Sequence, residues 1–202
     1  MLKQIIFDLN DTLVRGLTGV EEELSLQVDT PKDKILECLR DDKMLGFLLG
    51  ETSEDEFLGY VIRKNSWGID LNELKRMVRR NFDYVIDGMD ELVKELSSHY
   101  DLVLLSDQGK EWAEYVEEHH AFIRLIPHRF YSCDYGIRKT GKEIFELVLK
   151  RLGCGNQECL FIDDRERFLK MAEAVGIPSI EFKNVMQLRD ELDKHGVLCV
   201  KE

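Results

Sequence analysis

Residues 5–14 have the sequence IIFDLNDTLV, in which a short apolar run ends at a carboxylate, Asp8, and continues into Asn10, Asp11 and Thr12. A continuous apolar run of this length is typical of a strand that is buried on both faces of a sheet. Polar side chains at the carboxyl end of such a strand lie where open α/β sheets bind their ligands. The stretch therefore predicts a central strand over residues 4–9 and a polar site at its end.

Further apolar runs predict the other strands of the same sheet. They are LVLLS at 102–106, CLFID at 159–163 and SIEF at 179–182, with a weaker candidate, RFYSC, at 129–133. Helical patterns alternate with them, because apolar stripes at helical spacing occupy residues 88–97, 143–152 and 166–175. Strands alternating with helices over short links predict an α/β fold, a Rossmann-like parallel sheet flanked by helices on both faces.

Residues 15–86 interrupt this alternation with helical patterns and contain no convincing strand. Helix starts are predicted at Thr30, with Pro31 at the first helical position, at Thr52 or Ser53, and at Asp70. These side chains can accept hydrogen bonds from the free backbone N–H groups of a first helical turn. We therefore expect an α/β core formed by residues 1–14 and 87–202, with an all-helical insertion, residues 15–86, after the first strand.

The composition is that of a folded and acidic protein. The chain has 202 residues, 44% of them hydrophobic, and a net charge of −12, which disfavours a nucleic-acid partner because the charge repels phosphate backbones. The sequence shows no signal peptide and no apolar run long enough for a bilayer.

The five cysteines are scattered, and a zinc site at Cys154 and Cys159 is disfavoured because no histidine cluster accompanies them. We expect a cytoplasmic protein with reduced thiols and no membrane contact; the sequence carries no signal for oligomeric state.

Polar side chains follow three of the predicted strands and occupy one predicted loop. These residues are Asp8, Asn10 and Asp11 after the first strand, Ser106 and Asp107 after the second, Asp163 and Asp164 after CLFI, and Lys139 before the helix that starts near residue 142. We expect them to converge because the carboxyl ends of parallel strands share one edge of a sheet.

The converging groups suit phosphoryl transfer. Asp8, Asp163 and Asp164 form an oxygen-rich set of the kind that Mg²⁺ prefers. Asp8 is also a candidate nucleophile that would form an acyl phosphate. Ser106 and Lys139, with Asp107 beside them, are candidates for binding the phosphoryl oxygens and balancing charge in the transition state.

The same residues resemble the motifs of the haloacid dehalogenase superfamily. FDLNDTL resembles the first motif, Asp-x-Asp followed by a small residue and Thr, except that Asn10 replaces the second Asp. LLSDQ is similar to the second motif, Lys139 to the third-motif lysine with Thr140 where proline is usual, and LFIDDRE to the fourth. The helical insertion lies where such proteins carry a cap domain. The motifs together with the helical insertion are most similar to those of small sugar-phosphatase-like members and of the phosphatase domain attached to some epoxide hydrolases.

This resemblance implies a Mg²⁺-dependent phosphatase that acts on a small phosphorylated metabolite through an aspartyl-phosphate intermediate. Asp8 would be the nucleophile, the backbone carbonyl of Asn10 would join the metal ligands, and the cap would select the substrate. The residue at the position of Asn10 is normally the general acid and base. An amide cannot carry a proton, and losing general acid–base help costs about 10²–10⁴-fold in rate.

Two other functions are compatible with Asn10. Haloacid dehalogenases of this superfamily lack the second Asp, since a halide leaves without a proton, although the acidic pair Asp163 and Asp164 argues against this activity. A catalytically impaired member that binds a phosphorylated ligand or another protein is the other alternative.

Several of the residues also have purely structural interpretations. Asp164 and Ser106 could cap helices, and Lys139 could be a solvated surface lysine. His119 and His120 are interpreted as residues of an exposed helix end, where histidine favours the helix dipole, and not as metal ligands.

Overall fold

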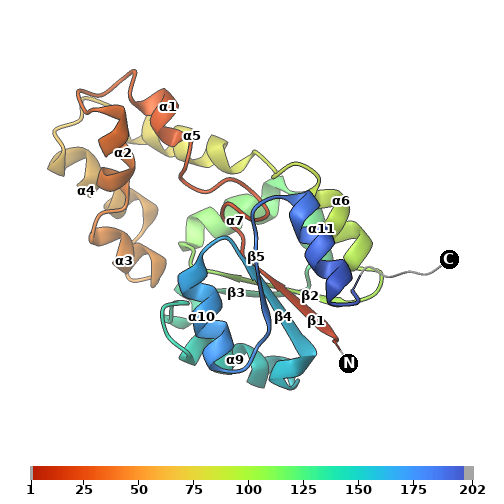
Figure 1. Ribbon diagram of the computed structural model, residues 1–202. Coiled ribbons are helices and arrows are strands. Elements are labelled where there is room, and N and C mark those ends of the chain that lie inside the picture. The colour runs from red at the N-terminus through yellow and green to blue at the C-terminus, as the bar shows by residue number, and fades with distance from the viewer. Residues whose placement is uncertain (1, 198–202) are drawn as a thin grey trace.

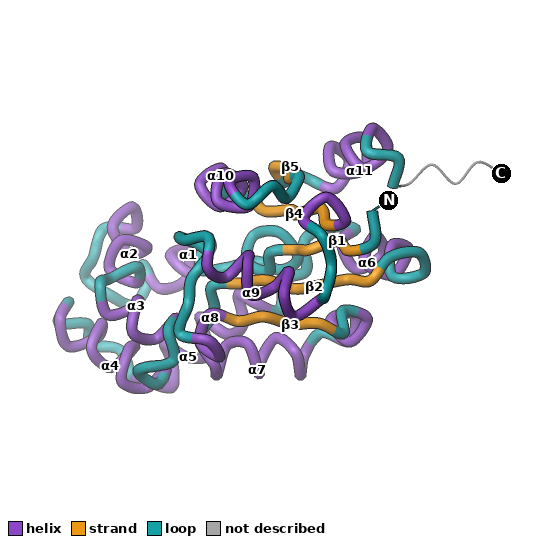
Figure 2. Tube along the Cα trace, turned by 90° about the horizontal axis from the view of Figure 1, so that it is seen from below, coloured by secondary structure: helices purple, strands orange, loops and turns teal. Residues whose placement is uncertain are grey.

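A five-stranded parallel sheet forms the centre of the computed structural model, which describes residues 2–197. The strands are β1 (Gln4–Phe7), β2 (Asp101–Ser106), β3 (His128–Tyr131), β4 (Cys159–Asp163) and β5 (Ser179–Glu181). Their order is β3-β2-β1-β4-β5, with β1 in the middle, as Figure 2 shows. In register, Phe7 lies beside Leu104 on one side and Ile162 on the other. The predicted parallel α/β fold is confirmed, and all five predicted strands are present.

Helices cover both faces of this sheet because successive strand residues point to opposite sides. Ile5 and Phe7 belong to one apolar cluster, with residues of α6 (Met89–Leu96), α7 (Lys110–His119) and α11 (Val185–Lys194). Ile6 belongs to a second cluster, with residues of α9 (Glu143–Leu152) and α10 (Glu166–Ala174). The short elements η1 (Ala121–Leu125), α8 (Ser132–Tyr135) and η2 (Asn156–Glu158) complete the core. None of the helices within residues 2–197 combines the length and apolar character needed to cross a bilayer.

The insertion after β1 consists of helices and lies at one end of the sheet (Figure 1). These helices are α1 (Val20–Leu24), α2 (Lys32–Leu39), α3 (Lys43–Leu48), α4 (Glu54–Lys64) and α5 (Leu71–Phe82). The two segments that join it to the core run side by side, since Arg15 N donates to Tyr84 O over 2.9 Å and Ile86 N to Leu13 O over 2.9 Å. We call residues 15–86 the cap from here on.

Two of the predicted helix starts in the cap are confirmed and one is wrong. Ser53 forms a capping box with Glu56, and Asp70 accepts from the first-turn N–H groups of Asn72 and Glu73. Thr30 does not cap α2, because Pro31 occupies the N-cap position. The Thr30 hydroxyl instead accepts a hydrogen bond of 2.8 Å from the indole of Trp67, which packs the loop before α2 against the loop after α4.

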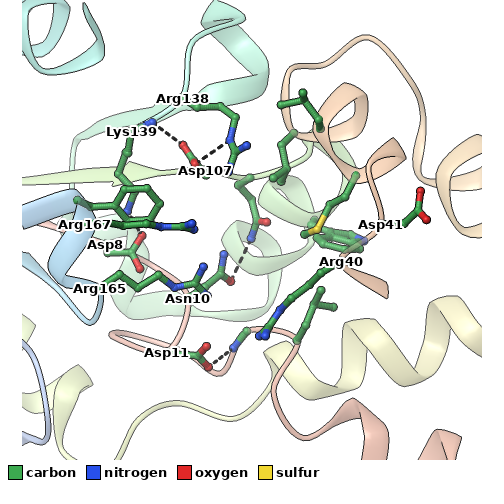
Figure 3. Close-up of a pocket in the computed structure, with 18 of the residues that line it drawn as sticks. Asp8, Asn10, Asp11, Arg40, Asp41, Asp107, Arg138, Lys139, Arg165 and Arg167 are labelled. Atoms are coloured by element: carbon green, nitrogen blue, oxygen red, sulfur yellow. Dashed lines mark hydrogen bonds and ion pairs between the residues drawn. The ribbon is translucent and has the colours of Figure 1, made fainter. Parts of the chain in front are cut away.

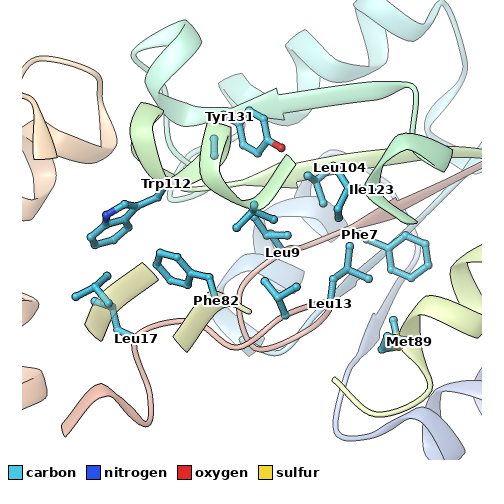
Figure 4. Close-up of a cluster of buried hydrophobic side chains, with 14 of the residues drawn as sticks. Phe7, Leu9, Leu13, Leu17, Phe82, Met89, Leu104, Trp112, Ile123 and Tyr131 are labelled. Atoms are coloured by element: carbon cyan, nitrogen blue, oxygen red, sulfur yellow. The ribbon is translucent and has the colours of Figure 1, made fainter. Parts of the chain in front are cut away.

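The first strand is shorter than predicted and ends at Phe7. The chain then turns tightly, with Asp11 at a φ of 60° and Leu13 N donating to Leu9 O over 2.9 Å. Leu9 and Leu13 are fully buried, and the apolar cluster continues from them through Leu17 and Phe82 to the cap (Figure 4). The loop after β1 is therefore held by packing, and it carries Asp8 and Asn10 on a fixed backbone.

Candidate active site

Lys139 lies at the centre of the site and bridges two carboxylates. Its Nζ is 2.5 Å from Asp8 Oδ1 and 2.6 Å from Asp163 Oδ2. Asp8 directly follows β1, Asp163 ends β4, and Lys139 lies in the loop before α9, so three segments meet at one ammonium group. The Lys139 side chain is only 1% exposed, which excludes the interpretation as a solvated surface lysine.

Burial and the neighbouring charges have opposing effects on the pKa values of Asp8 and Lys139. Burial raises the pKa of Asp8 to about 8, with a further contribution from Asp163 and an opposing one from Lys139. Burial disfavours the charge on Lys139, but the carboxylates of Asp163 and Asp8 outweigh it and raise the pKa of the ammonium. Lys139 is therefore charged at neutral pH, and Asp8 becomes a carboxylate more easily when further positive charge is close by.

The carboxylates could hold a divalent cation. Asp8, Asp163 and Asp164 each offer an oxygen within 4.8 Å of the others, and one ammonium among three carboxylates leaves two excess negative charges when all are ionised. Asp164 Oδ1 is buried without a hydrogen-bond partner among residues 2–197, and its pKa is raised, chiefly by burial. An orphaned oxygen and excess negative charge fit Mg²⁺, which prefers a few carboxylate ligands.

Ser106 and Asp107 follow β2 but differ in what they contact. Ser106 Oγ is buried and has no partner within the described chain, so it can still donate to a ligand. The side chain of Asp107 accepts hydrogen bonds of 2.8 Å from Lys139 N and 2.9 Å from Arg138 Nε, and its predicted contact with phosphate stays a prediction. Its carboxylate therefore fixes the loop that presents Lys139. Neither Ser106 nor Asp164 caps a helix, because α7 begins after Gly109 and α10 after Arg165.

Asn10 and Asp11 lie on the same turn as Asp8, but their side chains form hydrogen bonds with other groups. Asn10 Oδ1 accepts from Gln108 Nε2 over 3.4 Å, so the amide faces the loop after β2. Asp11 Oδ1 accepts from Gly16 N over 2.8 Å. Asp11 is committed to that turn, and it does not replace the missing carboxylate at Asn10.

Five of these residues, Asp8, Asn10, Asp11, Asp107 and Lys139, line a cavity of about 550 Å³ between the core and the cap (Figure 3). The cap side is largely apolar and includes Leu17, Met44, Leu45, Leu48 and Phe82, with Trp112 from the core. The polar side carries arginines that our sequence interpretation missed: Arg40 from the cap, and Arg138, Arg165 and Arg167 from the core. Two of them, Arg165 and Arg167, follow the acidic pair in the sequence DDRER, and this pattern could have indicated them.

The cap is docked onto the site by specific contacts. Ser132 Oγ donates to Leu48 O of the cap over 2.6 Å and accepts from Gln108 N over 3.0 Å. The ring of Phe47 covers Gly109 so closely that a Cβ there would lie 2.0 Å from it. Position 109 therefore requires glycine for the cap to close.

A buried carboxylate of the cap completes this docking. Glu54 is fully buried and accepts 2.9 Å from Trp112 Nε1 of α7 and 3.1 Å from Arg79 Nε of α5. His120, predicted at an exposed helix end, is in fact buried, and its Nε2 is 2.8 Å from Phe82 O at the end of α5. Only His119 is exposed as predicted. His120 thus links the core to the segment that leaves the cap.

Comparison with known families identifies this arrangement. A family model described as haloacid dehalogenase-like hydrolase matches residues 2–176. The chain belongs to this family. The predicted resemblance and the prediction of a hydrolase are confirmed, and the matched stretch contains every candidate site residue. The narrower likeness to sugar phosphatases and epoxide-hydrolase phosphatase domains stays a prediction.

Individual relatives carry names that bear on activity. Flavin mononucleotide hydrolase 1 of Arabidopsis thaliana, whose name places it in the chloroplast, is 28% identical over 193 residues, which is 96% of this chain and 77% of the relative. A haloacid dehalogenase family enzyme of Bacteroides thetaiotaomicron, solved with magnesium and inorganic phosphate, has a TM-score of 0.72 at 19% identity, covering 91% of this chain and 96% of its own. A structure titled as a dehalogenase has a TM-score of 0.71 at 18% identity, covering 89% of this chain and 84% of its own. The two structures show the shared fold.

Mg²⁺ is expected to stabilise the protein, and more so as the pH rises. The pKa of Asp8 in the folded chain is about 8, above its ordinary 3.8, so the folded state holds a proton there that the unfolded state has lost. Without metal, stability should fall as pH rises between these values. Metal competes with that proton, so binding strengthens with pH. Thermal unfolding with and without Mg²⁺ measures the effect, which reaches about 2.7 kcal/mol when Mg²⁺ is a hundred times its Kd.

The matched variants for this measurement are Asp164→Asn and Asp190→Asn. The first removes a carboxylate of the cluster and should lose the Mg²⁺ effect, while the second removes an exposed one on α11 and should keep it. Equal stabilisation of both variants would contradict the placement of the metal at Asp164.

Proposed function

We propose that this hydrolase is a Mg²⁺-dependent phosphatase that acts on a small phosphorylated metabolite through Asp8. The observation that carries the proposal is the buried Lys139 ammonium bound to Asp8 and Asp163 at the base of the cavity. Such a group holds a carboxylate in position and supplies positive charge where an incoming phosphate brings negative charge.

The chain's own residues suggest the steps. Lys139 holds Asp8 Oδ1, which leaves Oδ2 free to attack phosphorus. The P–O bond to the leaving group breaks with its electron pair on the departing oxygen, and an acyl phosphate forms on Asp8. Water then attacks phosphorus, returns the carboxylate and releases phosphate. Ser106 Oγ can donate to a phosphoryl oxygen throughout, because no other group within residues 2–197 binds it.

Mg²⁺ held by Asp8, Asp164 and the carbonyl of Asn10, with Asp163 close by, would supply charge neutralisation for the phosphoryl group. The backbone carbonyl of Asn10 is the metal ligand, and its side chain offers only hydrogen bonds. Substrates whose leaving group is stable without a proton should therefore react fastest. The cavity of about 550 Å³ accommodates a metabolite of nucleotide size. The activity named for the Arabidopsis relative places flavin mononucleotide among the first metabolites to test.

Hydrolysis of an aryl phosphate tests the proposal, since such an ester needs little help in leaving. We expect phosphate release that depends on Mg²⁺ and is lost when a chelator removes it. Turnover no higher than that of the Asp8→Asn variant would overturn the proposal.

Dehalogenation is the second candidate, because Asn10 is compatible with a leaving group that takes no proton. The acidic cluster disfavours it, since the carbon–halogen bond that would be attacked is uncharged and gains little from a cation held by these carboxylates. Halide release from 2-chloropropionate would establish this activity and displace the phosphatase proposal if aryl phosphate is not cleaved.

A further inference from the structure

Four arginines line the cavity although the protein as a whole carries a net charge of −12. Arg165 and Arg167 come from the start of α10, and Arg40 comes from the end of α2 in the cap. Figure 3 shows the two core arginines with their guanidinium groups toward the space beside Asp8 and Asn10, and Arg40 on the cap side of the cavity. These three residues, which we call the arginine rim, line one cavity from the core and from the cap.

The arginine rim forms few close ion pairs, although the acidic cluster of Asp8, Asp163 and Asp164 lies beside it. Within residues 2–197, Arg40 and Arg167 have no ion pair, and Arg165 reaches Asp164 only at 3.6 Å. Arg40 donates to the hydroxyl of Thr18 over 3.3 Å, and the Arg167 guanidinium lies 4.5 Å from the centre of the Phe168 ring, which fixes its direction.

Three of the carboxylates that line the cavity are bound to other groups. Asp11 is bound to Gly16 N and Asp107 to Arg138, while Asp41 is paired with Lys64. Guanidinium groups that face a cavity without a close ion-pair partner can pair with an anion bound there.

A second observation concerns the leaving group. The acid that would protonate it is absent, since Asn10 stands there and Asp11 is held by Gly16 N. A leaving oxygen that departs without a proton must be stable as an anion, and guanidinium groups stabilise phosphate anions by paired charged hydrogen bonds.

We infer that the substrate is a phosphoanhydride whose leaving group is itself a phosphate, bound by the arginine rim. This inference rests on the proposed function and names its substrate class. Asp8 attacks the terminal phosphorus, the bridging P–O bond breaks, and the bridging oxygen leaves with the electron pair as part of a phosphate anion that needs no proton. Water then cleaves the acyl phosphate and supplies the oxygen and protons of the released phosphate.

Phosphate release from ADP, AMP and p-nitrophenyl phosphate tests the inference in the presence of Mg²⁺. ADP and AMP share a nucleoside, but only ADP has a phosphate leaving group. We expect kcat/KM for ADP to exceed that for AMP by about a hundredfold or more, the size of a missing general acid. Arg167→Gln should lower kcat/KM for ADP about tenfold more than for p-nitrophenyl phosphate, the size of one charged hydrogen bond.

Lys170→Gln is the matched control, because it removes one positive charge from the exposed side of the same helix, where Lys170 pairs with Glu166 at 2.7 Å. It should leave all three rates unchanged. Arg40→Gln tests the cap side of the rim independently and covers the case in which Arg167→Gln fails to fold.

The outcomes separate the inference from the proposed function. If AMP is cleaved as well as ADP, or if the rim variants affect p-nitrophenyl phosphate as strongly as ADP, the inference is overturned and the phosphatase stands. If none of the three substrates reacts faster than with Asp8→Asn, both are overturned.

Discussion

Replacing Asp8 with asparagine is expected to lower phosphatase turnover by about 10⁴-fold or more, the scale on which loss of a nucleophile acts. The amide has the shape of the carboxylate but cannot form an acyl phosphate. Lys139 keeps Asp163 as a partner at 2.6 Å, so the variant should fold. Without metal, its stability should lack the part of the decline between pH 3.8 and about 8 that ionisation of the buried Asp8 causes.

Asp190→Asn is the control, since it makes the same chemical change on the exposed face of α11. Steady-state hydrolysis of p-nitrophenyl phosphate compares the two. An Asp8→Asn variant that is folded and retains more than a few per cent of the activity would show that another group attacks phosphorus.

Replacing Asn10 with aspartate is expected to raise turnover of an alkyl phosphate such as AMP by about 10²–10⁴-fold. A carboxyl group at this position can protonate the departing alcohol and then take a proton from the attacking water. The hydrogen bond from Gln108 to Asn10 Oδ1, at 3.4 Å, can be kept by a carboxylate oxygen. The gain should appear with a new limb in the pH–rate profile, because the added group titrates.

Asn72→Asp serves as the control, because it adds one negative charge to an exposed position of α5 that does not line the cavity. If Asn10→Asp leaves AMP turnover and its pH profile unchanged, position 10 is not where the leaving group is protonated. Low turnover of AMP would then have a cause other than the missing acid at position 10.

The parts of the site that were predictable from sequence are those set by strand topology. Asp8, Ser106 and Asp163 each lie at a strand end, and parallel register alone brings those ends to one edge of the sheet. Lys139 was found by its place in a motif, and its burial between Asp8 and Asp163 follows from the neutralisation that two adjacent carboxylates require.

The rest depends on packing between segments far apart in the chain. The bond from Trp112 to the buried Glu54 spans 58 residues, and the carbonyl of Leu48 meets Ser132 across 84. No local pattern marks such pairs. The arginine rim was not predicted for another reason. The net charge of −12 describes the whole surface and does not indicate which charges line one cavity.

Trapping the covalent intermediate tests the central claim most directly. Because Asn10 cannot activate water, the acyl phosphate should be hydrolysed slowly and accumulate during turnover. Wild-type protein mixed with Mg²⁺ and p-nitrophenyl phosphate, quenched in acid and analysed by peptide mass spectrometry, should carry one phosphate on Asp8, and hydroxylamine should remove it. Sustained hydrolysis of the substrate with Asp8 unmodified, or with the phosphate on another residue, would contradict the account.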